Sequence, residues 1–155
     1  MSQTMSNYTG ASQLATFHVA DLEFGVDVRR VQEVLRYQAM TRVPLAPKVL
    51  RGLINLRGQI VTAIDVRERL ALPPSESGEH PMNMIVRTED GAVSLLVDSI
   101  GDVIDVDAKT FEPVPDTLPP ALQPILDGVH KLDGHLLLVV NAERTLQLHR
   151  GAANA

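Results

Sequence analysis

Five histidines are the side chains of this sequence best suited to binding a metal ion: His18, His80, His130, His135 and His149. Their spacing gives no H-x-x-x-H or H-E-x-x-H pattern, and the sequence has no cysteine, so the usual zinc ligand sets are missing. His130 and His135 could meet across a predicted hairpin and bind a metal together. No clear third ligand accompanies them, which favours surface or strand positions. We therefore expect no metal and no cofactor.

Sequence patterns of catalytic sites are also missing. The chain contains no G-x-S-x-G, Walker or G-x-G-x-x-G pattern. Its acidic residues are scattered, and no two carboxylates are paired on a recognisable catalytic turn. We therefore expect the protein not to be an enzyme.

Arg57 is the charged residue in the most unusual position. Together with Gly58 it separates two apolar runs, Gly52–Leu56 and Ile60–Ile64. Two such runs around a two-residue turn predict a β-hairpin whose tip exposes Arg57 and directs its guanidinium outward. Such a group could bind an anion or a partner protein. The alternative is a solvated turn at which any polar residue would serve.

Composition limits the class of protein. A chain of 155 residues forms one compact domain or two very small units that share a core. Aromatic residues are only 3%, so Val, Leu and Ile must build that core. The net charge of −5 argues against nucleic acid or an anionic membrane as the main partner. No apolar run approaches the roughly 20 residues that span a bilayer, so we expect a cytoplasmic protein without membrane insertion.

The sequence is internally duplicated. The segment that begins at Gly52 recurs 76 residues later at Gly128, and Phe24–Val28 recurs 69 residues later as Val93–Val97. Each copy predicts four or five short strands and almost no helix. Units of this size are marginally stable alone, so we expect the halves to share a core or to exchange strands. Closing each unit into a small barrel would remove most exposed strand edges.

Corresponding positions in the two copies separate structural residues from specialised ones. Arg57 corresponds to Asp133, which is the sharpest difference between the two hairpins. Asp65 corresponds to Asn141, and both are predicted to cap a turn. The paired glycines are predicted to adopt positive φ or to allow strands to approach closely.

We expect the following organisation along the chain. A short helix is predicted over Lys48–Arg51 and another within Pro119–Leu126. The predicted segments are a disordered tail 1–13, a first repeat 14–72, a linker 73–82, a second repeat 83–148 and a C-terminal tail 149–155.

Several of these residues resemble the CheW family of chemotaxis coupling proteins. The strongest match is Gly52-Leu53-Ile54-Asn55-Leu56-Arg57-Gly58, followed by Ile64-Asp65-Val66-Arg67. Further matches are Phe24–Val28, Val31–Val34, Thr41–Pro44, Ala46-Pro47, Val97-Asp98, Gly101–Val103, and Gly128 with the Leu136–Asn141 strand. The resemblance covers about Leu14 to Leu148.

The resemblance implies a fold and partners. The fold is all-β, with two intertwined five-stranded SH3-like barrels and a few short helices. The implied function is that of a non-catalytic adaptor, monomeric when isolated, that joins the histidine kinase CheA to the cytoplasmic tip of chemoreceptors. Because the kinase's regulatory domain is itself CheW-like, its contact is expected to be barrel to barrel.

The resemblance also implies site residues. Those for receptor binding, or for supporting the receptor groove, are Val31, Glu33, Gly52, Arg57, Ile60 and Val103. The loop Phe111–Asp116 resembles a segment used in kinase–adaptor rings and gives Phe111, Glu112 and Asp116, although Glu112 stands where a basic residue can occur.

Two alternatives stay open at this point. One is a CheW-like adaptor of a pilus-motility pathway or another CheA-like pathway. The other, from a different class, is a small β-barrel enzyme or anion-binding protein that uses the Arg57 turn.

Overall fold

Short strands joined by tight turns make up most of the computed structural model, which describes residues 12–145. Among these residues α-helix is confined to the single turn α1 (Val66–Arg69) and to residues 142–145. The strands of the first half are β1 (Ser12–Val19), β2 (Leu22–Asp27), β3 (Val31–Leu35), β4 (Leu50–Leu56) and β5 (Gln59–Asp65). Those of the second half are β6 (Met82–Thr88), β7 (Gly91–Val97), β8 (Ser99–Val106), β9 (Phe111–Glu112), β10 (Leu126–Leu132) and β11 (His135–Val140). Three 3₁₀ turns are η2 (Val28–Arg30), η3 (Ala108–Thr110) and η4 (Gln123–Ile125).

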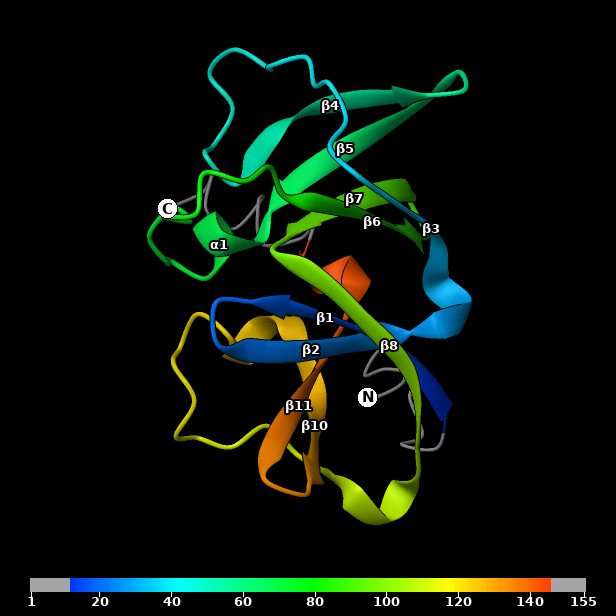
Figure 1. Ribbon diagram of the computed structural model, residues 1–155, viewed down its shortest axis with the longest axis vertical. Coiled ribbons are helices and arrows are strands. Elements are labelled where there is room, and N and C mark those ends of the chain that lie inside the picture. Colours follow the sequence, from blue (N-terminus) through cyan, green and yellow to red (C-terminus); the bar gives the residue numbers. More distant parts are fainter. Residues whose placement is uncertain (1–11, 146–155) are drawn as a thin grey trace.

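The two halves exchange hairpins (Figure 1). One sheet has the order β3-β6-β7-β5-β4, so the second-half hairpin β6–β7 lies among first-half strands. The other has the order β8-β1-β2-β11-β10-β9, so the first-half hairpin β1–β2 lies among second-half strands. The all-β, intertwined fold is therefore confirmed. One sheet has five strands, and the two-residue β9 is the sixth strand of the other.

Each sheet closes on itself at an equivalent place. In the first, Thr41 from the β3–β4 connection forms an antiparallel bridge with Leu53 on β4. In the second, β9 pairs with β10. Both closures pass over a glycine: a Cβ on Gly52 would lie 2.8 Å from the Thr41 carbonyl oxygen, and one on Gly128 would lie 2.5 Å from the Phe111 ring. The close approach predicted from the paired glycines is confirmed, since no larger residue fits there without a shift.

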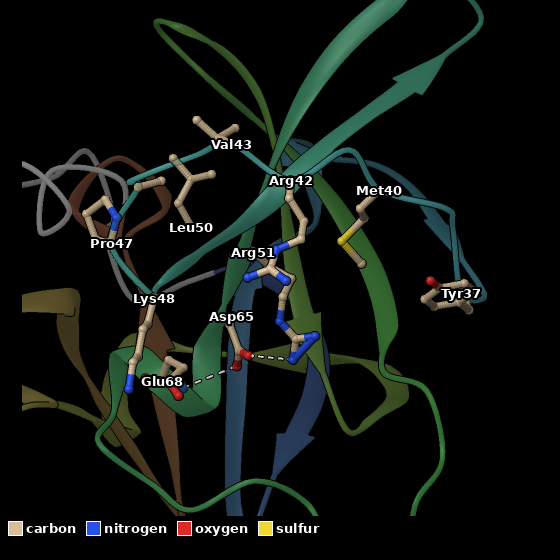
Figure 2. A pocket seen from close by; sticks show the side chains of 11 residues that line it. Tyr37, Met40, Arg42, Val43, Pro47, Lys48, Leu50, Arg51, Asp65 and Glu68 are labelled. Atoms are coloured by element: carbon tan, nitrogen blue, oxygen red, sulfur yellow. Dashed lines mark hydrogen bonds and ion pairs between the residues drawn. The ribbon is translucent and has the colours of Figure 1, made fainter.

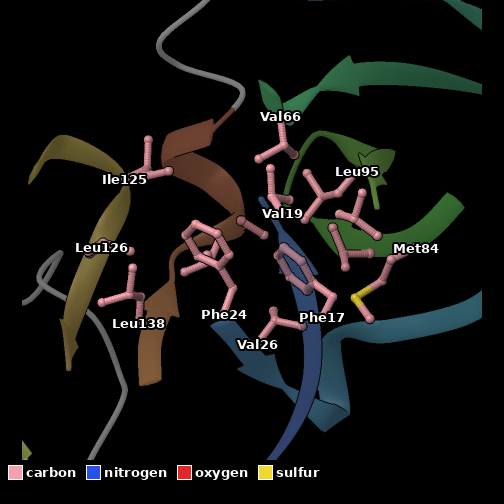
Figure 3. Close-up of a cluster of buried hydrophobic side chains, with 14 of the residues drawn as sticks. Phe17, Val19, Phe24, Val26, Val66, Met84, Leu95, Ile125, Leu126 and Leu138 are labelled. Carbon is pink, nitrogen blue, oxygen red and sulfur yellow. The ribbon is translucent and has the colours of Figure 1, made fainter. Parts of the chain in front are cut away.

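The largest apolar cluster lies between the two sheets and takes residues from both halves (Figure 3). Phe17 and Phe24 stack at its centre, with ring centroids 5.2 Å apart. Met84 and Leu95 approach from the five-stranded sheet, and Leu138 from the six-stranded one. A smaller cluster fills each barrel. Burying one such side chain contributes about 1.5–3 kcal/mol, and because the cluster takes residues from both halves, its contribution depends on both.

Ion pairs also join the halves. Arg67 on α1 donates from Nε and Nη2 to the two carboxylate oxygens of Asp98, at 3.0 and 2.6 Å. The guanidinium lowers the pKa of Asp98 from its usual value, and the same carboxylate accepts the Ala20 backbone N–H at 2.8 Å. A second ion pair has the same direction, because Arg30 of the first half donates to Glu143 of the second at 3.0 Å.

Some local expectations need correction or lie outside the described range. The predicted helix over Lys48–Arg51 is wrong: a turn covers 48–49 and β4 already begins at Leu50, because the segment must pair with β5. The second predicted helix is found only as the 3₁₀ turn η4. The predicted tails lie outside residues 12–145, except that Ser12 and Gln13 belong to β1.

Because each barrel needs strands from both halves, neither Met1–Pro74 nor Ser75–Ala155 is expected to fold alone. Mixing the two fragments should restore β-sheet circular dichroism and a cooperative transition, because the missing strands are then supplied. Cooperative thermal unfolding of either isolated fragment, seen by two probes, would contradict the exchange of strands as the basis of stability.

Candidate protein-binding sites

The turn of the β4–β5 hairpin is formed by Arg57 and Gly58, at φ values of 52° and 88°. Positive φ at both central residues defines the type I′ turn that suits a two-residue hairpin. The Asn55 side-chain oxygen accepts the Gly58 N–H at 3.0 Å and fixes the turn. Glycine and asparagine are the usual residues at the Arg57 position, because a larger side chain there costs roughly 1–2 kcal/mol. The hairpin thus holds an arginine where the backbone disfavours one.

The guanidinium of Arg57 forms an ion pair with Glu33 on β3. Beside it, the Gln32 side-chain amide donates to the Gln59 side-chain oxygen at 3.3 Å. Strands β3 and β4 are the two edges of the five-stranded sheet, so these contacts bring the hairpin tip to the opposite edge. The Arg57 side chain stays 70% exposed, which leaves its outer face open to a partner.

The other residues predicted for receptor binding lie in different parts of the structure. Ile60 lies next to the tip on β5 and is 59% exposed, so it extends the surface of Arg57. Val31 packs against the central core. Gly52 is buried beneath Thr41 and Met40 near the start of β4, at the end of that strand away from the Arg57 tip. Val103 is exposed but lies on β8 in the six-stranded sheet, where it pairs with Ala15. No strand pairing brings Val103 to the hairpin.

The segment Phe111–Asp116 lies on the other barrel. Phe111 is half-buried and packs on the ring of His130, with centroids 5.2 Å apart. Glu112 is exposed and lies 3.6 Å from the Lys131 amine, which offsets part of its charge. Asp116 is exposed on the connection that follows β9. The three residues therefore lie along one stretch of surface whose base is His130.

His130 and His135 do not share a site, and they lie at the strand and surface positions that the sequence favoured over a joint metal site. His130 is buried, and its Nδ1 lies 2.7 Å from the Thr110 hydroxyl. His135 is exposed, and its Nε2 lies 2.7 Å from a Glu23 carboxylate oxygen. The register of β10 and β11 separates them, because His130 faces Leu137 and His135 faces Leu132.

The turn-capping prediction for Asp65 and Asn141 is confirmed. Asp65 accepts the Glu68 backbone N–H at 3.2 Å, and Asn141 accepts the equivalent Arg144 N–H at 3.0 Å. The Asp65 carboxylate also accepts a hydrogen bond from the Arg51 guanidinium, with Nη2 and Oδ2 2.8 Å apart. These polar side chains are therefore structural.

A pocket of about 520 Å³ opens beside Arg51, and the sequence did not predict it (Figure 2). It is lined mostly by the connection between β3 and β4, with Asp65 and Glu68 at its base. The sequence indicates this pocket only through its charge, because residues 36–51 contain four basic residues and no acidic residue. Its lining residues are Tyr37, Met40, Arg42, Val43, Ala46, Pro47, Lys48, Leu50, Arg51, Asp65 and Glu68.

Within residues 12–145 no helix has the length and apolar character needed to cross a bilayer. The same residues contain no cluster of three or more metal-binding side chains.

A doubled, strand-exchanged barrel that exposes charged turns is a scaffold for protein contacts. The family model described as the CheW-like domain matches residues 13–150. The chain belongs to this family.

Relatives over most of the chain agree. The chemotaxis protein CheW of Bacillus subtilis is 30% identical over 134 residues, which cover 86% of each chain. That of Rhizobium meliloti is 28% identical over 134 residues, again 86% of each. The crystal structure of the scaffolding protein TtCheW from Thermoanaerobacter tengcongensis superposes with a TM-score of 0.75 at 26% identity. That match covers 84% of this chain and 89% of the other.

Because His130 is buried, the stability of the fold should depend on pH. Burial lowers its pKa below the usual value, with the carboxylate of Asp107 acting weakly in the opposite direction. In the unfolded chain the histidine takes up a proton near pH 6.5, whereas the folded protein resists protonation, so stability should fall as the pH drops below that value. Urea titrations between pH 5 and 8 should show a smaller loss for His130→Gln than for the wild type. Identical pH dependence of the two proteins would contradict a buried neutral imidazole.

Proposed function

We propose that this protein couples chemoreceptors to the histidine kinase CheA, and that the receptor is bound by the β4–β5 hairpin tip with β3. The family and its named relatives support the adaptor role, and CheW-type adaptors are not enzymes. Arg57, Glu33 and Ile60 are the residues we assign to the receptor contact, with Val31 and Gly52 supporting them. Val103 lies on a different sheet, and we assign it to the far side of the same partner.

The backbone of Arg57 is the observation that carries the receptor assignment. A residue whose only task was to close the turn would be Asn, Asp or Gly. Arginine at φ 52° costs stability, and strain of this kind is usually held where it serves a function. The corresponding Asp133 does not have positive φ, so the duplicated fold does not require the strain.

The charges of the two barrels differ at the same place. The positions that correspond to Glu33 and Arg57 are Asp102 and Asp133, two acids that cannot form an ion pair. Only the first barrel therefore presents an oriented guanidinium at its edge. Arginine is favoured at the centre of protein interfaces because its planar fork makes two directed hydrogen bonds.

For the second barrel, we assign Phe111, Glu112 and Asp116 to a kinase or ring contact. They are supported by their place on an accessible stretch of the barrel that does not carry Arg57. We also propose that the protein acts in the cytoplasm at receptor arrays and that it is a monomer when isolated.

The alternatives are weaker. An anion-binding or catalytic role for the Arg57 turn is disfavoured because Glu33 already pairs with the guanidinium. An adaptor of another CheA-like pathway would use the same surfaces. Binding to a receptor of that pathway, and not to a chemoreceptor, would identify it.

Substitution of Arg57 tests the receptor assignment. Arg57→Ala should weaken receptor binding by about 2 kcal/mol, as expected for an interface arginine, and change folding stability by less than about 0.5 kcal/mol. Arg57→Asn should weaken binding equally and leave stability equal or higher, because asparagine suits the turn. Arg57→Lys should restore binding only in part. Co-sedimentation with receptor vesicles and urea unfolding are the measurements.

The matched control is Asp133→Ala at the corresponding tip of the other barrel, which should bind receptor like the wild type. Equal losses for the Arg57 and Asp133 variants, or a loss that accompanies unfolding, would show that the assignment is wrong.

A further inference from the structure

His130 occupies a buried position at which the other barrel has an apolar residue. The repeat offset of 76 residues aligns it with Ile54, since Gly128 aligns with Gly52. The two side chains are equally buried, with His130 at 0% and Ile54 at 1% exposure. Burial favours an isoleucine, whereas a buried imidazole must be hydrogen-bonded and is kept neutral. The duplicated fold therefore does not require a histidine at this position.

Two of the residues that cover His130 come from a short stretch that closes the second barrel. This stretch, residues 107–112, contains η3 and β9, and we call it the β9 strap. The Thr110 hydroxyl lies 2.7 Å from His130 Nδ1, and the Phe111 ring packs on the imidazole. Figure 1 shows the chain turning at the end of β8 and returning toward β10, with which the strap pairs. A change in the charge of the imidazole therefore acts directly on the strap.

The β9 strap is short and mostly exposed. Strand β9 has two residues, each of which pairs with one residue of β10. The Phe111 ring crosses over Gly128, which offers no side chain to hold it. Glu112 is exposed, and its ion pair with Lys131, at 3.6 Å, adds little because water screens the charges. A segment of this kind can open locally while the rest of the protein stays folded.

The charges around His130 oppose its protonation or compensate it only weakly. Burial lowers the pKa of His130, and the carboxylate of Asp107, at the start of the strap, acts weakly in the opposite direction. Strand β11 places the uncharged Leu137 opposite the histidine. The remaining charged or titratable side chains on η3, β9, β10 and β11 are Lys109, Glu112, Asp127, Lys131 and His135. The closed strap therefore favours the neutral imidazole.

We propose that His130 is a proton-sensitive latch, which keeps the β9 strap closed while its imidazole is neutral and releases the strap when the imidazole takes up a proton. Opening lets water reach the charged ring, which is buried in the closed strap. Because Phe111 and Glu112 belong to the strap and Asp116 follows it, opening removes the surface that we assign to the kinase or ring contact. The proposal rests on the proposed function for what the latch controls, and not for the latch itself.

The test is hydrogen exchange of the full-length protein, followed by mass spectrometry and corrected for the intrinsic effect of pH on exchange. In the open strap the hydrated histidine takes up a proton near pH 6.5, so lowering the pH from about 7.5 to about 5.5 should favour the open form about tenfold. The protection of residues 107–112 should fall by that factor. The protection of the β6–β7 hairpin, which lies in the other sheet, should change less than twofold.

Two substitutions remove the titrating group. His130→Ile introduces the residue of the other barrel, and His130→Gln keeps a hydrogen-bonding side chain, so the test does not depend on one variant folding. In both, the protection of the strap should change less than twofold over the same pH range. The matched control is His135→Gln, which removes an exposed histidine from the neighbouring strand β11 and should keep the tenfold fall.

Three results would overturn the latch. The first is strap protection in the wild type that does not change with pH, and the second is an unchanged fall in both His130 variants. The third is an equal fall in the β6–β7 hairpin, which would show that the whole protein unfolds and that the strap does not open by itself.

The same exchange measurement with the organism's purified CheA homologue separates the latch from the proposed contact. A kinase that binds the closed strap opposes its opening, so its addition at about pH 5.5 should raise the protection of residues 107–112. Unchanged strap protection with the kinase, together with the expected pH dependence in its absence, would support the latch. It would contradict the assignment of Phe111, Glu112 and Asp116 to the kinase contact.

Discussion

Two parallel strand pairings hold the molecule together, and every surface feature depends on them. Strand β5 of the first half pairs with β7 of the second, and β11 of the second pairs with β2 of the first. Corresponding residues make the two pairings, so Thr62 lies opposite Val93 as Leu138 lies opposite Phe24. Because a barrel is completed only by strands of the other half, the central core and both hairpin tips form together or not at all.

The duplicated sequence keeps the fold at some positions and changes its surface at others. Glycines at 52 and 128 let the chain cross closely at both closures, and Asp65 and Asn141 cap equivalent turns. At the tips and connections, by contrast, charge differs between the copies. The protein thus presents one barrel with basic, strained features and another with acidic ones, on a frame that is nearly the same.

The sequence was sufficient for the repeat and the exposed hairpin, because apolar patterns and paired glycines are local signals. The repeat left a shared core and an exchange of strands both open, and the family resemblance implied the exchange. It did not predict the contact of Glu33 with Arg57, since β3 and β4 are opposite edges of one sheet. The predicted helix at Lys48 failed because pairing with β5 overrides local helical preference. The register of β10 and β11, which the sequence does not reveal, places His130 and His135 opposite other residues and not opposite each other.

The central claim is that one adaptor holds receptor and kinase at the same time through separate surfaces. The most direct measurement is the affinity of the purified kinase for this protein, free and already saturated with receptor vesicles. We predict that the two affinities agree within about twofold, and that the kinase sediments with the vesicles only when the adaptor is present. Displacement of the kinase by the receptor, or sedimentation of the kinase without the adaptor, would contradict the account.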